Sequence, residues 1–380
     1  MSPTSRPESP QPDSTIAWSD PQRQAQFEAW FSPLCTSQHL VADSLRLAST
    51  DASFRRYLRV DGAPGTPTRS LIIMDAPPEL IGSKPFVQVA ELMANAGLTV
   101  PSVLAWDEAH GFLLLTDLGP QTMLQALQAQ AQTPPPLGLY LDAVETLVQW
   151  QLATREGVLP PYDQAFVMRE LELFPQWYIG EYRKFTLEDA QRKTLDAAFA
   201  TIARNNLAWP NVFMHRDFMP RNLMIPDIPP AANLAPASAK PSATRLGVLD
   251  FQDAVYGPIT YDIASLMRDA FISWDEDFCL DVTIRYWEKA RKAGLPVGDD
   301  FGEFYKGVEW MGLQRHLKIA GIFARLSLRD GKPQYLADTP RFIAYIRATC
   351  ARYMELKPLL RLVEKVEGIP VPNAYAFGRA

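Results

Sequence analysis

The segment MHRDFMPRNLMI, residues 214 to 225, constrains the fold of this chain more than any other. It ends in a short apolar run that predicts a strand, and a second such run, LGVLDF, follows at residues 246 to 251. The stretch between them, residues 226 to 245, is rich in Pro, Ala and Ser and predicts a loop insert. Without this insert the two runs form a tight hairpin, so Asn222 and Asp250 are expected to meet at its open end. Asp217 then lies on the loop that leads in.

Two carboxylates and an amide in this arrangement suit phosphoryl transfer. Asn222 and Asp250 are predicted metal ligands, because Mg²⁺ prefers oxygen ligands. Asp217 is the predicted catalytic residue, which orients an acceptor hydroxyl and takes its proton, while His215 braces the loop. His-Arg-Asp, four residues, Asn and a later Asp is also the pattern of kinase catalytic loops. The alternative is a chance match, with Asp217 and Asn222 serving only as turn residues.

The rest of the chain separates a β-rich region from a helical one. Residues 1 to 20 are rich in Pro, Ser and charge, which predicts disorder, and a first helix is expected at residues 21 to 31. Residues 40 to 118 predict the order strand, strand, strand, helix, strand, strand. Beyond residue 119 helical spacing dominates, and one of these helices opens with Thr186 and Asp189 at capping-box spacing.

The predicted fold is therefore α+β and bilobal, like a protein kinase. By the resemblance of the HRD segment to kinase catalytic loops, a small β-rich N-lobe at residues 21 to 118 is expected to bind nucleotide. A large helical C-lobe at residues 119 to 380 carries the catalytic loop and the 226–245 insert.

Composition excludes several classes of function. The net charge is −6 and no dense Lys/Arg block occurs, which argues against nucleic acid or an anionic membrane as partner. Cys35, Cys279 and Cys350 are too few and too far apart for a disulfide framework or a zinc site. No apolar run reaches the roughly 18 residues of a membrane helix. We expect a cytoplasmic protein.

Two stretches carry a family resemblance. HRDFMPRN followed by VLDFQDAVYGPITYDIASLMRD resembles the aminoglycoside phosphotransferase and choline kinase-like branch of the protein-kinase fold. Within that branch TDASFRRYLRV, LIIMDAPPE and RELELFPQWY are similar to bacterial anomeric kinases of cell-wall amino sugars. The resemblance covers roughly residues 25 to 360. It implies transfer from ATP, with Mg²⁺, to the 1-hydroxyl of N-acetylmuramate or N-acetylglucosamine in peptidoglycan recycling.

The resemblance also places a nucleotide site in the N-lobe, with two departures from a usual kinase. The phosphate loop LASTDASF has no glycine, and Met74 stands where a kinase has its strand-three lysine. Arg56 shares a strand face with Leu58 and Val60, so we expect it to bind phosphate or a carboxylate, with Glu91 a candidate ion-pair partner. The nucleotide-binding candidates are Ser49, Thr50, Asp51, Ala52, Ser53, Arg56, Glu91, Leu115, Asp117 and Leu118.

Arg55 and Arg59 point the other way along that strand and are expected to be solvated. The adenine is expected to bond to backbone between Leu115 and Leu118.

The acceptor is expected between Asp217 and the helices. Its candidate ligands are Glu170, Glu172, Trp177, Tyr178, Arg216, Arg221 and Asp253. Two alternative functions stay open: a kinase of an aminoglycoside, choline or homoserine, and a non-catalytic nucleotide-binding scaffold. The missing lysine and the glycine-poor loop favour the scaffold, whereas the intact catalytic set argues against it. A protein kinase is disfavoured because no Ala-Pro-Glu-like motif follows Asp250.

Overall fold

The computed structural model describes residues 16–18, 20–49, 54–129, 136–226 and 245–370. It divides into two compact units. Among the described residues, the first comprises those up to Pro120 together with Pro226, and the second comprises residues 121–225 and 245–370. The α+β fold class predicted from the sequence is confirmed, since the first unit holds an antiparallel sheet and the second is mostly helical. The disorder expected at residues 1 to 20 and the insert expected at 226 to 245 lie almost entirely outside the described residues.

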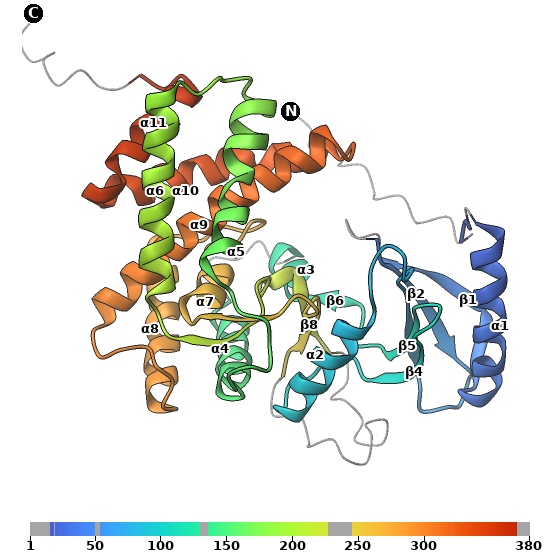
Figure 1. Ribbon diagram of the computed structural model, residues 1–380. Helices are drawn as coiled ribbons and strands as arrows, with labels where there is room; N and C mark the ends of the chain where they lie inside the picture. The colour runs from blue at the N-terminus through green and yellow to red at the C-terminus, as the bar shows by residue number, and fades with distance from the viewer. Residues whose placement is uncertain (1–15, 19, 50–53, 130–135, 227–244, 371–380) are drawn as a thin grey trace, which may run out of the picture. The chain divides into compact units, whose positions relative to one another are not determined.

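The first unit is built on a five-stranded antiparallel sheet in the order β1-β2-β3-β5-β4 (Figure 1). The predicted order of strands and helix over residues 40 to 118 is confirmed. The elements are α1 (Pro21–Ser37), β1 (Leu40–Ser49), β2 (Arg56–Gly62), β3 (Ser70–Asp75), α2 (Lys84–Asn95), β4 (Val103–Asp107) and β5 (Phe112–Thr116).

Helix α1 covers one face of this sheet, and α2 lies on the opposite side (Figure 1). Asp20 caps α1 by accepting a hydrogen bond from the Gln22 amide at 2.8 Å. The helix packs Phe27 and Phe31 into one core with alternate residues of the strands. It runs past the predicted end at residue 31, with Pro33 inside it, because the residues that follow continue the same packing against the sheet.

The second unit begins with a short strand that pairs with β8 and continues as helices. Its first part comprises β6 (Gln121–Thr122), α3 (Met123–Ala129), α4 (Leu137–Leu152), α5 (Gln164–Leu171), a π-helix (Phe174–Tyr182), α6 (Asp189–Leu207), β7 (Asn211–Met214), a 3₁₀ turn (Pro220–Asn222), β8 (Leu223–Ile225) and β9 (Gly247–Val248). Its second part comprises β10 (Val255–Pro258), α7 (Thr260–Met267), α8 (Glu276–Lys292), α9 (Phe301–Leu328), a 3₁₀ helix (Pro333–Asp338), α10 (Thr339–Arg352), a 3₁₀ turn (Met354–Leu356) and α11 (Lys357–Glu367).

The predicted capping box of α6 is wrong by two residues. The box is formed by Glu188 and Gln191, whose side-chain oxygen accepts from the Glu188 amide at 3.0 Å. Thr186 and Asp189 do not form it because the helix begins at Asp189, which makes Glu188 the N-cap.

Helix α9 is the central element of the second unit and packs against α6, α7, α10 and the π-helix. At Gly321 it passes so close to the chain before the π-helix that a Cβ atom would meet the Leu173 backbone at 2.4 Å. Only glycine allows this approach. The helix is buried over most of its length, so its polar residues must find partners inside the protein.

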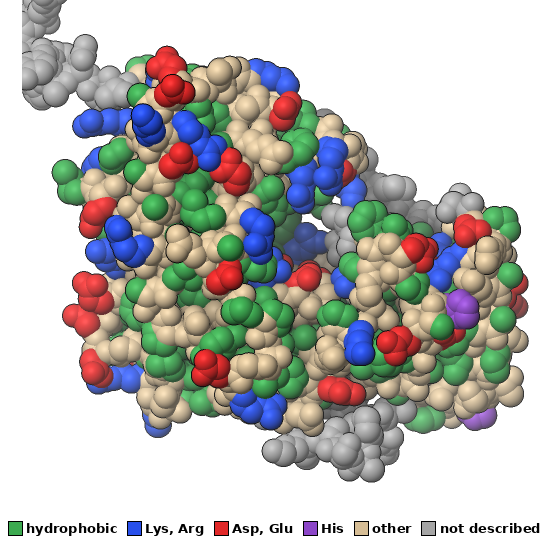
Figure 2. Space-filling view, viewed as in Figure 1, with side chains coloured by type: hydrophobic (Ala, Val, Ile, Leu, Met, Phe, Trp, Pro, Cys, Tyr) green, Lys and Arg blue, Asp and Glu red, His purple; other side chains and the backbone are tan. Residues whose placement is uncertain are grey.

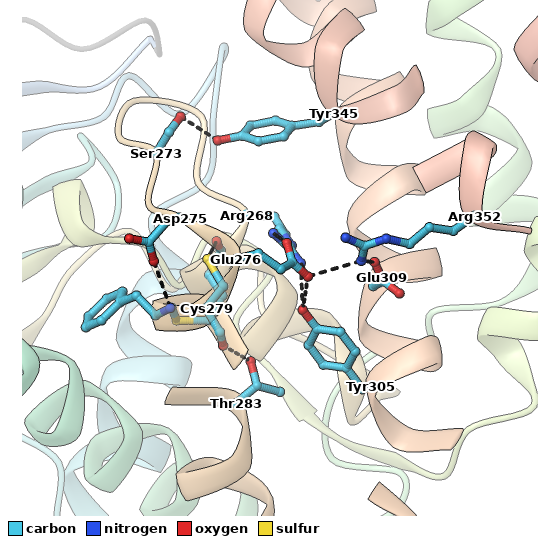
Figure 3. Close-up of polar contacts among 12 residues, drawn as sticks. Arg268, Ser273, Asp275, Glu276, Cys279, Thr283, Tyr305, Glu309, Tyr345 and Arg352 are labelled. Atoms are coloured by element: carbon cyan, nitrogen blue, oxygen red, sulfur yellow. Dashed lines mark hydrogen bonds and ion pairs between the residues drawn. The ribbon is translucent and has the colours of Figure 1, made fainter. Parts of the chain in front are cut away.

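A polar cluster joins the ends of α7 and α10 to α8 and α9 (Figure 3). Arg268 donates to both carboxylate oxygens of Glu276 at 3.0 Å each and to the Tyr305 hydroxyl at 2.9 Å. Arg352 contacts the same Glu276 at 3.1 Å and also pairs with Glu309. Bidentate and shared contacts of this kind fix the relative positions of helices better than single surface pairs.

Acidic and basic side chains are interspersed over the face of the helical unit in Figure 2, where neither sign forms an extended patch. Within the described part of the chain, no helix combines the length and the apolar character needed to cross a membrane.

Candidate active site

The loop that carries Asp217 is anchored at both ends by strands. Its first residues follow β7, which pairs with β10 so that Met214 lies opposite Val255. Val212 and Phe213 are buried and hold this strand in the core. After the loop, β8 pairs with both β6 and β9.

The loop backbone is held by side chains that come from far along the chain. Asp262, in the first turn of α7, accepts from the His215 amide at 2.7 Å and from the Arg216 amide at 3.0 Å. Arg315 of α9 donates to the Arg216 carbonyl at 2.6 Å. Arg216 has a left-handed φ of +78°, which costs a non-glycine residue about 1–2 kcal/mol. These three bonds offset that strain.

His215 is buried and braces the loop as predicted. Its Nδ1 atom accepts from the Asp217 amide at 3.2 Å, and its Nε2 atom lies 3.0 Å from the Leu249 carbonyl. The first contact requires an unprotonated Nδ1. The ring proton is therefore on Nε2, which donates a hydrogen bond to the Leu249 carbonyl. Burial lowers the pKa of His215, which keeps the ring neutral in this form. The ring therefore links the Asp217 loop to Leu249, the residue that follows β9.

Asn222 and Asp250 are brought together by the predicted hairpin. Leu223 lies opposite Val248, and the Asn222 amide Nδ2 is 3.4 Å from Asp250 Oδ2 and 2.9 Å from the Asp217 carbonyl. Asp250 has a left-handed φ of +61°, a conformation that Asp tolerates better than most residues.

The oxygen atoms of Asn222 and Asp250 suit a magnesium ion better than a metal ion whose ligands all come from the protein. The bonds of Asn222 engage its nitrogen, which leaves the amide oxygen as its possible ligand beside the Asp250 carboxylate. Mg²⁺ commonly takes one or two protein oxygens and fills its other positions with water and phosphate. Within the described residues no group of three or more His, Cys, Asp and Glu side chains forms a metal-binding cluster.

The Asp217 carboxylate is half-buried among cations. Burial raises the pKa of Asp217, but Lys318, Arg315 and Arg216 lower it further than burial raises it, so its pKa lies below the ordinary value. The carboxylate is therefore ionised at every pH near neutrality and can accept a hydrogen bond from a hydroxyl.

The sequence did not predict Arg315, Lys318 or Asp262 as parts of this site. The available signal was their placement, since Arg315 and Lys318 lie within the long, mostly apolar stretch of α9, where a cation needs a buried partner. Which carboxylates serve as partners depends on how α9 packs, and periodicity alone does not reveal that.

Arg56 pairs with a carboxylate, one of the two kinds of partner expected, but the residue is Asp75 and not Glu91. Its guanidinium pairs with Asp75 at 2.8 Å, donates to the Ala17 carbonyl at 3.0 Å and stacks over the Trp18 ring at 3.9 Å. The suggested pair with Glu91 is wrong, because Asp75 lies directly across the β2–β3 ladder from Arg56, while Glu91 is exposed on α2. The face of β2 that holds Arg56 is the one packed on α1.

The expectation that Arg55 and Arg59 are solvated is wrong as well. Arg55 is buried, and Arg59 donates to both carboxylate oxygens of Asp117 at 2.6 and 3.1 Å. Asp117 also accepts from the Ser70 hydroxyl at 2.7 Å and from the Gly119 amide at 2.9 Å. Its side chain thus fixes the end of β5 in place.

The other nucleotide candidates stay predictions. Residues 50 to 53 lie outside the described residues, and for Ser49 only the strand backbone is described. Leu115 is buried in the ladder between β3 and β4, and Leu118 is half-buried just beyond β5.

Two of the acceptor candidates are engaged away from Asp217. Glu172 forms a bidentate pair with Arg192 of α6, with both distances 2.8 Å. The Tyr178 hydroxyl donates to Glu367 of α11 at 2.9 Å. The structure therefore does not bring these two side chains to the catalytic loop, whereas half-buried Trp177 stays a prediction.

The remaining acceptor candidates lie at or beside the loop. Arg221 stacks over the Phe271 ring at 4.9 Å, and Asp253 is exposed with its carbonyl 3.4 Å from the Arg216 guanidinium. Arg216 and Glu170 pair with each other at 2.9 Å. Glu170 is thus part of the buried support of the loop.

Comparison with known proteins agrees with this geometry. A model of the phosphotransferase enzyme family matches residues 44–300, and the chain belongs to this family. The N-acetylmuramate/N-acetylglucosamine kinase of Neisseria meningitidis serogroup B is 45% identical over 348 residues, which cover 91% of this chain and 97% of that protein. The protein of the same name from Pseudomonas putida is 44% identical over 326 residues, which cover 86% and 89%.

Solved structures share the fold at much lower identity. An ADP-bound aminoglycoside phosphotransferase superposes with a TM-score of 0.54 and 14% identity, over 82% of this chain and 95% of that one.

Proposed function

We propose that this protein is a kinase of N-acetylmuramate and N-acetylglucosamine that uses ATP and Mg²⁺. The transferred phosphoryl group goes to the anomeric 1-hydroxyl, which places the reaction in peptidoglycan recycling. The main support for this proposal is that Asp217, Asn222 and Asp250 lie together on one hairpin and the loop before it. The chain that holds them is 45% identical to a kinase named for these two sugars.

Asp217 is the residue that acts on the acceptor. Its ionised carboxylate accepts a hydrogen bond from the sugar hydroxyl, orients the oxygen toward the phosphorus atom and takes the proton as the new bond forms. The low pKa of Asp217 favours orientation over early proton removal, because a weak base gains a proton only when the hydroxyl has become strongly acidic.

Asn222 and Asp250 would hold the magnesium ion. When bound, the ion supplies positive charge that neutralises the phosphates during transfer. In the first unit the proposed phosphate loop remains residues 49 to 53, and the proposed adenine contacts remain the backbone from Leu115 to Leu118.

The test is a phosphate-transfer assay with purified protein, ATP and Mg²⁺. N-acetylmuramate, N-acetylglucosamine, kanamycin and choline are supplied separately, and products are identified by mass and by ³¹P NMR. We expect a sugar 1-phosphate from the two amino sugars and from neither of the other compounds. Transfer only to kanamycin or choline would contradict the proposed acceptor.

The catalytic role is tested in the same assay with Asp217→Asn. The amide keeps the size of the side chain but cannot take a proton, so turnover should fall roughly 10²–10⁴-fold. A variant that stays folded by circular dichroism and keeps wild-type turnover would contradict the assignment of Asp217.

A further inference from the structure

A buried network of charges surrounds the Asp217 loop, and the transfer step described above leaves part of it unused. Its cations are Arg216, Arg315 and Lys318, and its anions are Glu170 and Asp262 together with Asp217 itself. Arg315 and Lys318 are 1% and 7% exposed, and Glu170 is 6% exposed. Charges so deep in a protein are tolerated only when they are paired.

Glu170 is the hub of this network. Its Oε1 atom accepts from Arg216 Nη2 at 2.9 Å and from Lys318 Nζ at 2.8 Å, and its Oε2 atom accepts from the Tyr162 hydroxyl at 2.5 Å. Beyond these, Gln314 donates to Tyr162 at 2.7 Å. Both carboxylate oxygens of Glu170 therefore accept from donors that are themselves part of the fold.

The network continues past Lys318, which also contacts the Tyr261 hydroxyl of α7 at 3.3 Å. Tyr261 in turn lies under the Arg315 guanidinium at 4.9 Å. The groups around Glu170 therefore come from the chain before α5, from the catalytic loop, from α7 and from α9.

The placement of Arg216 explains why this hub matters for catalysis. Arg216 directly precedes Asp217 and is in a left-handed conformation that an arginine seldom adopts. Asp262 and Arg315 hold its backbone, while Glu170 holds its side chain, with the Phe166 ring 4.9 Å from the guanidinium. Loss of Glu170 would leave the buried guanidinium without its anion, and any shift of Arg216 would displace the adjoining Asp217 carboxylate.

We propose that Glu170 is a positioning residue, which through Arg216 holds the Asp217 carboxylate where it meets the acceptor hydroxyl. This inference rests on the proposed phosphotransferase activity. It replaces the expectation that Glu170 binds the sugar, because the carboxylate is already occupied by buried donors.

The test compares transfer to the sugar with hydrolysis of ATP by water, measured in the same reaction. Misplacing Asp217 lowers transfer more than hydrolysis, whereas a loss of folded protein lowers both equally. Glu170→Gln keeps the size of the side chain but leaves two buried cations without their anion. We expect its transfer-to-hydrolysis ratio to fall roughly tenfold or more, with the KM for ATP little changed.

Two further variants make the result specific. Glu172→Gln is the matched control, because this carboxylate is two residues away and pairs only with surface Arg192 among the contacts described. Its ratio should equal that of the wild type. Tyr162→Phe removes the hydroxyl that donates to Glu170 Oε2 but leaves the Glu170–Arg216 pair in place, so it should lower thermal stability and keep the ratio within about threefold of wild type.

Each outcome decides a separate point. An unchanged ratio in folded Glu170→Gln overturns the inference, and so does an equal drop in Tyr162→Phe, which would indicate a general effect of the buried network. If Glu170→Gln does not fold, the Glu170→Asp variant takes its place, with a partial drop expected and an unchanged ratio counting against the inference. If the wild type transfers phosphate to no sugar, the proposed function fails instead.

Discussion

The clearest test of how the catalytic loop is held is the substitution Asp262→Asn. In the wild type the two carboxylate oxygens of Asp262 accept from two successive amides, those of His215 and Arg216, at 2.7 and 3.0 Å. An asparagine keeps one acceptor oxygen and places an NH₂ group against the other amide. One buried amide is then unsatisfied.

The size of the effect follows from the bond that is lost. A hydrogen bond to a buried charged group contributes about 1.5–3 kcal/mol, and an unsatisfied buried amide adds to the loss. We expect the free energy of unfolding to fall by about 2–4 kcal/mol, which corresponds to roughly 5–10 °C in Tm for a unit of this size. The loosened loop should also lower kcat roughly 10–100-fold, because a displacement of about 1 Å can cost that much.

Thermal melting and hydrogen exchange check this prediction together. The amides of His215 and Arg216 should lose protection in Asp262→Asn, while those of β7 keep theirs. The control is Asp277→Asn, which makes the same Asp-to-Asn change at an exposed position in the first turn of α8. Its Tm should stay within about 1 °C of the wild-type Tm. An Asp262→Asn protein with wild-type Tm and with both amides still protected would refute the reasoning.

Two further predictions concern buried carboxylates outside the catalytic loop. Burial raises the pKa of Asp269 to about 6, so the folded state keeps a proton that the unfolded chain releases near 3.8. The contribution of this protonated group to stability is therefore present at low pH and is lost as pH rises from about 4 to about 6. Over that interval the free energy of unfolding of Asp269→Asn, measured by urea titration, should gain on the order of 3 kcal/mol relative to wild type. A difference between the two proteins that does not depend on pH would contradict this. Asp75→Asn removes the anion shared by Arg23 and Arg56 and should destabilise the first unit by about 3 kcal/mol, because the Asp75 side chain is only 5% exposed. Asp61→Asn breaks an exposed pair and should change stability by less than about 1 kcal/mol; equal effects of the two would show that burial is not the cause.

The sequence predicted local features that depend on neighbouring residues. The hairpin between β8 and β9 followed from two apolar runs and a loop-like insert, and it placed Asn222 beside Asp250 correctly. Alternation along β2 correctly put Arg56 on the same face as Leu58 and Val60, and indicated that it needs a buried partner. Hydrophobic periodicity predicts such features because it indicates which side of a single strand or helix faces the core.

Partners across the fold were decided by the tertiary structure. Strand register selected Asp75 for Arg56, whereas the sequence predicted only a phosphate or a carboxylate and suggested Glu91 as a candidate. The same holds for the site, where Lys318 reaches Glu170 and Arg315 reaches the Arg216 carbonyl, although both cations come from a helix about one hundred residues beyond the loop.

The physical reason for this division is the range of the interactions. Which face of a strand or helix is buried depends on a repeat of a few residues and is visible in the sequence. Which buried charge meets which depends on how whole elements pack, and an ion pair forms only within about 4 Å. The chain by itself therefore determined that Asp217, Asn222 and Asp250 lie together, and the packing of α5, α7 and α9 decided what holds the Asp217 loop in place.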